Sequence, residues 1–408
     1  MKLAGIIFAD SGDAEYSVLI KHRTLAGLPF GARYRMIDFA LSNMVNSGIG
    51  NVGIVVVNNY QSLIKHVRAG EEWDLDRKHT SVTVLPPYAD NSSGTEMYRN
   101  RLEGLQANLT YIANYITEDY ILVMGCDYVS NTDYSKMLDY HVKSGALLTV
   151  LCKQDPEEKI QAVDDSGGDK EDPEGRGDRH QGERLTAMLV ARRKPGAIVN
   201  SVTVDRDGMI DRMEVGAKPK KGYLTSMNTY ILSRKDLVKI LLHADAARFR
   251  SLRRDVFPSL VAEKKAAAYI MPDLALGVNN VSDYLRSNLA LLHGDVRRQL
   301  FESENGQIIT RVKDSPPTRY GSHAEVSNSL IADGAIIDGR VKNSVIFRGV
   351  HVGEGAVIEN SVVMQDSVIS SGVRLNYCIL DRLVTIEPGR ALSGYLTHPF
   401  LVEKDTRI

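Results

Sequence analysis

The chain of 408 residues has little cysteine and little tryptophan. It contains three cysteines, Cys126, Cys152 and Cys378, and a single tryptophan. The cysteines are odd in number, far apart and outside any Cys-x-x-Cys step, which argues against both a disulfide framework and a zinc site. We therefore expect three small buried side chains in a protein of the reducing cytoplasm.

An excess of charge of either sign and long apolar runs are also missing. Lysine and arginine number 50 and aspartate and glutamate 51, so nothing in the charge favours nucleic acid or an anionic membrane as a partner. No run approaches the roughly 20 apolar residues that span a bilayer. The apolar stretch Leu3–Phe8 is too short for a signal-peptide core and lacks a cleavage site. It predicts a first buried strand.

Short apolar runs alternate with helix-like stretches in the first part of the chain. This alternation predicts an α/β fold with a doubly wound, mostly parallel sheet covered on both faces. Ligands of such sheets bind beyond the carboxyl ends of the strands, where Asp10, Asp13 and Asp127 lie. The predicted strands are Val52–Val57, Tyr120–Met124 and Leu147–Leu151, and the predicted helices are Ser62–Ala69, Leu102–Asn114 and Ser135–Ser144.

Residues 164–184 are rich in Asp, Glu and Gly and have too few apolar side chains to offset the entropy of ordering. They predict a solvated loop inserted in the first domain. After this loop, Ser201–Val204 and Met209–Val215 flank the turn Arg206-Asp207-Gly208, which predicts a hairpin.

The last 80 or so residues repeat an asparagine-led step. Asn328, Asn343, Asn360 and Asn376 are separated by 15, 17 and 16 residues, with glycine-centred turns between them. A short repeat of apolar residues and turns predicts a β-solenoid of about four coils, each of which buries its aliphatic side chains on the next. The near-constant spacing disfavours an antiparallel sandwich.

Four segments in a fixed order carry a family resemblance: Pro29–Gly48, Glu72–Arg77, Val82–Tyr88 and Met137–His141. Through them the chain resembles the ADP-glucose pyrophosphorylases, or glucose-1-phosphate adenylyltransferases, over essentially its whole length. The resemblance implies a nucleotidyltransferase-like domain at residues 1–295, a linker at 296–320 and a left-handed β-helix at 321–408.

The family's phosphate-binding loop, which reads roughly GGxGxRLxPLT, has no counterpart here. Its glycines align with Asp10, Ser11 and Asp13, its arginine with Glu15, and a later lysine with Leu25. Glycines let backbone N–H groups approach a phosphate, and cations offset its charge. We therefore expect that this loop no longer binds a triphosphate.

The family holds magnesium between two carboxylates during adenylyl transfer. The resemblance assigns the first to Asp127, in the step Gly125–Tyr128, and the second to a position that is Gly277 here. Asp273 and Asp283 lie nearby in the sequence but do not align. We expect no metal site, a vestigial catalytic Asp127, and magnesium as a cofactor only if some activity remains.

The adenine-contacting step aligns with Tyr98–Ala107, where Asn100 and Arg101 replace a glycine and a threonine. Arg99 and Arg101 are bulky where a base would approach, and we expect them at a solvated helix start. By contrast, Tyr98, Lys218 and Ser226 match positions that bind the sugar phosphate.

Family effectors are anionic phosphosugars and nucleotides, for which the resemblance suggests Arg33, Arg35 and Arg319 as binding residues. Arg319 follows Pro316-Pro317, which is similar to the family's interdomain linker. A structural ion pair of Arg33 or Arg35 with Asp38 is an alternative.

The whole pattern is most similar to the GlgD-type regulatory subunit of bacterial glycogen biosynthesis. It predicts a catalytically degenerate, cytoplasmic subunit that joins a GlgC-type catalytic subunit in a hetero-oligomer, expected to be a heterotetramer. Two alternatives stay open: an active ADP-glucose pyrophosphorylase, and a non-catalytic sugar-phosphate sensor or structural subunit.

Overall fold

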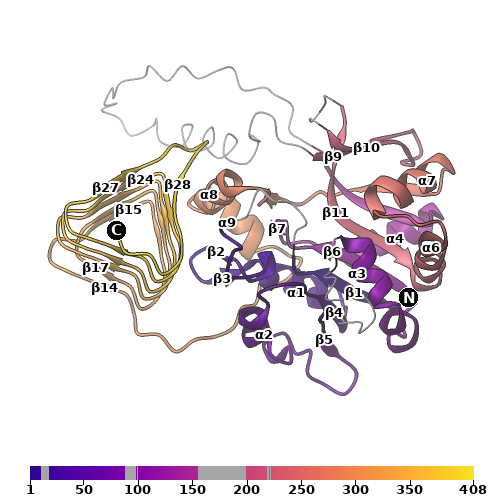
Figure 1. Cartoon of the computed structure of the whole chain (residues 1–408), viewed down its shortest axis with the longest axis horizontal. Coiled ribbons are helices and arrows are strands. Elements are labelled where there is room, and N and C mark those ends of the chain that lie inside the picture. Colours follow the sequence, from indigo (N-terminus) through magenta and orange to yellow (C-terminus); the bar gives the residue numbers. More distant parts are fainter. Residues whose placement is uncertain (11–17, 88–97, 99, 155–198, 218–219, 221) are drawn as a thin grey trace. The chain divides into compact units, whose positions relative to one another are not determined.

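The computed structural model describes residues 1–10, 18–87, 98, 100–154, 199–217, 220 and 222–408. Asp13, Glu15, Arg99, Lys218 and the expected loop at 164–184 lie outside the described residues. The described chain forms two compact units (Figure 1). The first comprises the described residues within 1–154, 199–279 and 299–314, and the second contains residues 280–298 and 315–408.

A nine-stranded sheet forms the centre of the first unit. Its strands follow the order β10-β9-β11-β6-β1-β4-β5, and β8 joins β11 to β12. The apolar runs form these strands because their side chains can be buried on both faces of a sheet. The bounds are β1 Leu3–Phe8, β4 Asn51–Val55, β5 Ser81–Leu85, β6 Tyr120–Gly125, β8 Leu148–Gln154, β9 Val199–Val204, β10 Ile210–Ala217, β11 Leu224–Ser233 and β12 Ala266–Ile270.

The sheet fits the expected α/β class, but it is mixed where a mostly parallel sheet was predicted. β1 runs parallel to β4 and β6, and β4 runs parallel to β5. Strand β11 adds antiparallel pairs with β6, β8 and β9, so the sheet is mixed at one end. The predicted hairpin is confirmed, since β9 and β10 pair antiparallel. Two small sheets pair β2 Pro29–Phe30 with β3 Tyr34–Arg35, and β7 Tyr128–Ser130 with β13 Ala275–Gly277.

Helices cover both faces of the sheet, as predicted (Figure 1). One face packs its apolar side chains against α3 and α6. On the other face α4 lies against β8, where His141 Nδ1 is 2.7 Å from Thr149 Oγ1. The helices of this unit are α1 Met36–Asn46, α2 Gln61–Val67, α3 Arg101–Ala107, α4 Tyr134–Ser144, α6 Arg234–Ala246 and α7 Phe257–Ala262, with short helical turns at Leu25–Gly27, Glu71–Trp73, Tyr111–Tyr115 and Leu252–Val256.

The helix predicted at 102–114 is shorter in the structure. Helix α3 ends at Ala107, and a separate π-helical turn covers Tyr111–Tyr115. The buried Asn108 follows α3, and its Nδ2 donates to Gly104 O at 2.8 Å. A side-chain amide that bonds the backbone four residues earlier competes with the next helical turn, which explains the break.

The second unit contains a three-faced parallel β-helix, as expected. Each face is a five-stranded sheet, so the stack has five rows, one more than the count of about four that was predicted (Figure 1). The first face is β14 Arg319–Tyr320, β17 Ile336–Ile337, β20 His351–Val352, β23 Val368–Ile369 and β26 Thr385–Ile386. The second is β15 Glu325–Ser327, β18 Arg340–Lys342, β21 Val357–Glu359, β24 Arg374–Asn376 and β27 Ala391–Ser393. The third is β16 Leu330–Ile331, β19 Val345–Ile346, β22 Val362–Val363, β25 Cys378–Leu380 and β28 Phe400–Val402.

The asparagine steps form a ladder along one corner of this β-helix. Asn328 Nδ2 donates to Asn343 Oδ1 at 2.8 Å, and Asn343 donates in turn to Asn360 at 3.3 Å. Asn360 then donates to Asn376 at 3.0 Å. The first three have φ between 41° and 49°, a left-handed conformation that asparagine tolerates better than most residues. The repeat seen in the sequence is therefore both a hydrogen-bond ladder and a turn signal.

Two helices belong to the segment before the β-helix, α8 Val281–Ala290 and α9 Gly294–Phe301. Helix α8 packs on β22, and Ser282 Oγ donates to Thr397 O at 2.6 Å. The three cysteines are free and buried, as expected. In the described part of the chain no helix combines the length and the apolar character needed to cross a membrane.

Candidate functional site

A cavity of about 390 Å³ lies in the first unit, at the carboxyl ends of strands β1, β4 and β6. Asp10, just after β1, and Asp127, just after β6, both line it. This is where an α/β sheet binds ligands. The lining residues are Phe8, Asp10, Ile20, Lys21, Arg23, Val55, Val57, Asn58, Asn59, Tyr98, Asn100, Arg101, Asp127, Asn228, Tyr230, Ser251, Leu252 and Arg253.

Asp127 is 7% exposed, and one of its two carboxylate oxygens is bound by neighbouring side chains. Oδ2 accepts a hydrogen bond from Asn228 Nδ2 at 2.8 Å and lies 3.4 Å from Arg101 Nη2. The other oxygen, Oδ1, is buried and has no hydrogen-bond partner among the described residues. The charge of Asp127 is therefore balanced from within the protein.

The side chain of Arg101 turns into the cavity. Its Nη1 donates to Asn228 O at 2.9 Å, and its guanidinium carbon lies 5.5 Å from the centroid of the Phe8 ring. It also crosses Gly125, where an added Cβ would lie 2.1 Å from Nη2. Only glycine leaves room for this crossing, so the observed position of the Arg101 side chain requires a glycine at residue 125.

Arg101 stands at a helix start, as predicted, but the prediction that this start is solvated is wrong, since the side chain of Arg101 is only 17% exposed. Asn100 caps α3, with Oδ1 accepting from Leu102 N at 2.8 Å and from Glu103 N at 3.2 Å. The cap fixes Arg101 as the first helical residue, with its side chain over the strand ends. Packing against Phe8 and pairing with Asp127 then stabilise it there.

Asn228 links the two sides of the cavity, and sequence reasoning missed it. Its backbone is left-handed, with φ 54°, at a register shift of β11. Its Oδ1 accepts from Asn200 Nδ2 at 3.1 Å, Tyr230 Oη at 3.3 Å and Arg253 Nη1 at 3.4 Å. The register shift in β11 that positions Asn228 cannot be predicted from the local sequence. The nearest residue that the sequence analysis singled out was Ser226, two residues earlier.

Among the described residues, the lining of the cavity carries more positive than negative charge, although the sequence led us to expect the loss of cations there. The described lining residues include four cationic side chains, those of Lys21, Arg23, Arg101 and Arg253, and two carboxylates. Sequence reasoning missed Lys21, Arg23 and Arg253. Arg253 lies far along the chain from the others, and only folding brings it to this edge of the sheet.

Asp10 is the second carboxylate of the cavity. Its Oδ2 accepts from Val57 N at 2.9 Å. Burial raises the pKa of this carboxyl to about 6, and the backbone hydrogen bonds from Val57 and Asn58 only partly offset this effect. Asp10 is therefore mostly ionised at neutral pH but carries an unfavourable desolvated charge.

Gly277 lies beside Asp127 in the fold. It pairs with Tyr128 between β13 and β7, and Val278 N donates to Asp127 O at 2.7 Å. A glycine here offers no side-chain ligand. Asp273 Oδ1 instead accepts from Asn305 at 3.3 Å, and Asp283 pairs with Arg286 at 2.9 Å within α8.

The residues matched to the sugar phosphate lie in different places. Tyr98 lines the cavity, and its hydroxyl donates to Pro86 O at 3.1 Å. Ser226 is buried in β11 and is not part of the cavity wall, and its Oγ accepts from Asn228 N at 3.4 Å. Lys218 lies outside the described residues.

The three arginines considered for an effector have separate surroundings. Arg33 is exposed, with its guanidinium 5.8 Å from the Tyr34 ring centroid. The guanidinium of Arg35 donates to Ser62 O at 2.9 Å, while the backbone N of Arg35 donates to Asp38 Oδ2 at 2.9 Å. Arg319 is exposed in β14, in the second unit.

Asp38, the alternative ion-pair partner considered for Arg33 and Arg35, is fully buried and has other side-chain partners. Its Oδ1 lies 2.6 Å from His66 Nε2, and its Oδ2 accepts from Thr310 Oγ1 at 2.5 Å. These contacts give Asp38 a structural role inside the first unit.

A mixed α/β sheet with a cavity at its strand ends, joined in one chain to a three-faced parallel β-helix, defines a nucleotidyltransferase with a hexapeptide-repeat C-terminus. Two family models match accordingly: nucleotidyl transferase over residues 22–162, and the GlmU-like C-terminal hexapeptide over residues 316–394. The second match agrees with the left-handed β-helix that the resemblance implied.

Relatives named glucose-1-phosphate adenylyltransferase occur in Bacillus mycoides (strain KBAB4), Bacillus cereus (strain ATCC 10987 / NRS 248) and Bacillus thuringiensis (strain Al Hakam). Each is 31% identical over 394 residues, which covers 95% of this chain and 94% of the relative. The chain belongs to the glucose-1-phosphate adenylyltransferase family.

Proposed function

We propose that this chain is a regulatory, catalytically degenerate subunit of glucose-1-phosphate adenylyltransferase. That enzyme makes ADP-glucose and diphosphate from ATP and glucose 1-phosphate for glycogen synthesis, and the chain would modulate a catalytic partner subunit. One observation carries the proposal: the guanidinium of Arg101 is bound to Asp127, the carboxylate that the family resemblance assigns to the metal.

Magnesium does not fit this site well. Mg²⁺ needs near-octahedral oxygen ligands at about 2.0–2.1 Å and is usually held by carboxylates together with substrate phosphates. Asp127 Oδ2 is already bound by Asn228 and Arg101, and Gly277 supplies no second carboxylate. A Mg²⁺ ion bound to Asp127 would lie close to the guanidinium of Arg101, and two cations a few ångströms apart repel each other by on the order of several kcal/mol.

The cavity nevertheless has the character of a binding site for an anion. Its volume of about 390 Å³ falls within the range of small-molecule sites. Lys21, Arg23 and Arg253 could bind a phosphate group without a metal. These three cations support the proposal that the subunit binds a phosphosugar or nucleotide but does not transfer its phosphate.

Assembly with a GlgC-type catalytic subunit into a heterotetramer is the second part of the proposal. The family resemblance implies it, and exposed apolar side chains on the β-helix are available for burial in such an interface. These side chains are Tyr320, Val326, Val368, Leu383, Tyr395 and Phe400.

One observation favours the alternative of an active enzyme. The buried Oδ1 of Asp127 has no partner among the described residues, and Asp10 lines the same cavity. If Arg101 moved away on substrate binding, these two carboxylates could take up a magnesium ion in a different arrangement. This alternative predicts magnesium-dependent turnover by the isolated chain.

The proposal is tested by co-expression with a glucose-1-phosphate adenylyltransferase catalytic subunit from the same cell. ADP-glucose formation is measured for the catalytic subunit alone and for the co-purified pair. We expect the two chains to co-purify and the pair to have a different kcat or effector response. Separate elution, or identical kinetics with and without the chain, would exclude a regulatory role.

A variant separates modulation from hidden catalysis. In the pair, Asp127→Asn in this chain should leave the modulated rate unchanged, because our proposal assigns no turnover to Asp127. If this substitution removes the added rate, the chain contributes an active site and the alternative is correct.

A further inference from the structure

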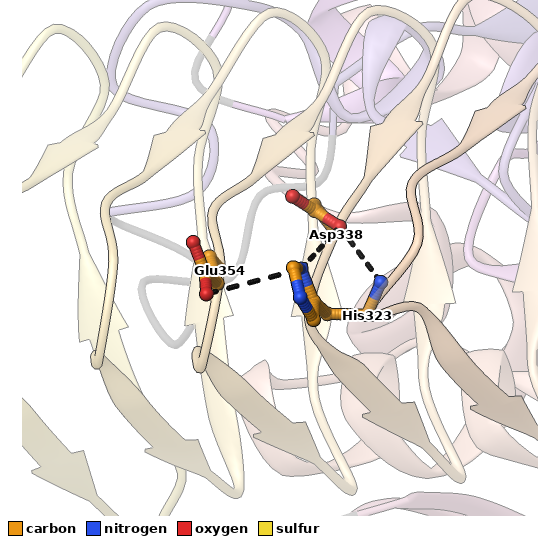
Figure 2. Close-up of side chains that lie close together, drawn as sticks. All are labelled: His323, Asp338 and Glu354. Carbon is orange, nitrogen blue, oxygen red and sulfur yellow. Dashed lines mark hydrogen bonds and ion pairs between the residues drawn. The ribbon is translucent and has the colours of Figure 1, made fainter.

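Three possible metal ligands lie together on the β-helix, outside the cavity (Figure 2). His323, Asp338 and Glu354 are separated by 15 and 16 residues, which is one coil each. They follow β14, β17 and β20 respectively, three neighbouring strands of the first face. The stacking of the coils therefore brings them to the same corner.

Their distances are close to those that a metal ion requires. His323 Nδ1 lies 3.5 Å from Asp338 Oδ1 and 3.8 Å from Glu354 Oε1. All three ligand atoms lie within 4.8 Å of one another. Ligands that bind zinc tetrahedrally at about 2.0–2.2 Å are about 3.3–3.6 Å apart. Small rotations of exposed side chains would close the difference.

A backbone hydrogen bond holds one of the three ligands in place. Asp338 Oδ1 also accepts a hydrogen bond from His323 N at 3.1 Å. Gly321 makes this approach possible, since an added Cβ there would lie 2.1 Å from the same oxygen. The carboxylate of Asp338 is thus fixed against the turn that carries His323.

The charge of the cluster sets it apart from three other carboxylates on the β-helix. Glu325, Asp333 and Glu387 pair with arginines, namely Arg340, Arg348 and Arg407. In the described part of the chain, the ion-pair contacts of Asp338 and Glu354 are those with His323. A neutral imidazole does not balance two carboxylates, whereas a divalent cation does.

We propose that His323, Asp338 and Glu354 bind one divalent transition-metal ion, of which zinc is the best-fitting example. An imidazole nitrogen with two carboxylates is a ligand set that zinc accepts. Magnesium and calcium prefer oxygen ligands alone. Three protein ligands leave a fourth position for water or for a group of a partner molecule.

The test is a calorimetric titration of the metal-stripped full-length chain with Zn²⁺. We expect one zinc bound per chain at this site. His323→Asn, Asp338→Asn and Glu354→Gln should each weaken its affinity at least tenfold. The control is His398→Asn, which removes another exposed histidine of the β-helix and should leave the affinity unchanged. A tenfold excess of Mg²⁺ should not displace the zinc.

Two results would overturn the proposal. One is a wild-type chain that binds no zinc at millimolar concentration. The other is zinc binding that survives all three substitutions or is weakened equally by His398→Asn. The ligand residues are partly or fully exposed, so loss of folding is not expected. A zinc-dependent shift of the Nδ1 resonance of His323, measured by nitrogen-15 NMR, would identify the coordinating atom.

Discussion

The Nη2 atom of Arg101 lies 3.4 Å from Oδ2 of Asp127, across a glycine that leaves room for it. A carboxylate at the end of a central strand is thereby paired with a cation of the protein itself. Gly277, which lies beside Asp127, offers no second ligand. A metal would have to displace Arg101, and this relationship underlies the first prediction.

Removing Arg101 and restoring a carboxylate should restore magnesium binding. The double variant Arg101→Ala/Gly277→Asp should bind Mg²⁺ at least tenfold more tightly than the wild type, as measured by calorimetry. An aspartate Cβ at 277 would contact mainly the flexible amide of Asn279, at 2.7 Å, so the fold should tolerate it.

The single variant Gly277→Asp is the matched control for this experiment. It should gain little affinity, because Arg101 still repels the ion. Equal affinity in the wild type and the double variant would show that Arg101 does not occupy a metal position.

Asn228 should contribute strongly to the stability of the first unit. Asn228→Ala removes the bond to the buried Asp127 and leaves several partners unsatisfied. We expect a loss of about 2–3 kcal/mol in the free energy of unfolding. Asn228→Gly should lose about 1 kcal/mol less, because glycine adopts φ 54° without strain. Urea unfolding measures the stability loss of each variant. Equal losses would show that the left-handed backbone at residue 228 adds no strain to the alanine variant.

Asp10 should make stability depend on pH. Its pKa in the folded chain is about 6, against an ordinary value of 3.8, so the folded state binds the proton more tightly than the unfolded state does. Stability should therefore fall as the pH rises from about 4 through 6. Asp10→Asn should increase stability above pH 7, by up to about 3 kcal/mol, and have little effect near pH 4. A gain that is the same at pH 4 and pH 8 would contradict the raised pKa.

The cations of the cavity should bind phosphate groups. Arg253→Ala should weaken binding of glucose 1-phosphate or ATP about tenfold without magnesium, with a loss that shrinks at high salt. The adjacent Arg254 is exposed and does not line the cavity, so Arg254→Ala is the matched control. If both variants bind as the wild type does, the ligand lies elsewhere.

Much of the fold could be predicted from local patterns. The apolar runs at 52–57, 120–124 and 147–151 overlap β4, β6 and β8, and the asparagine steps marked the coils. Asp127 was found because a residue that follows a buried parallel strand lies at the ligand-binding edge.

The rest of the site depends on long-range structure. Arg101 was assigned to solvent because its helix start gave no sign that Phe8 and Asp127 lie beneath it. Asn228 is positioned by a register shift in β11, and Arg253 is brought in from a distant helical turn. The family resemblance could not reveal Asn228 or Arg253, since neither was matched to one of its motifs.

The most direct test of the account is a single-turnover measurement on the isolated chain. The chain, in excess over labelled glucose 1-phosphate, is incubated with ATP and Mg²⁺, and ADP-glucose is quantified over time. We predict no more product than without Mg²⁺, because Arg101 balances Asp127 and Gly277 supplies no ligand. Magnesium-dependent ADP-glucose formation that Asp127→Asn abolishes would contradict the account and identify the chain as an active enzyme.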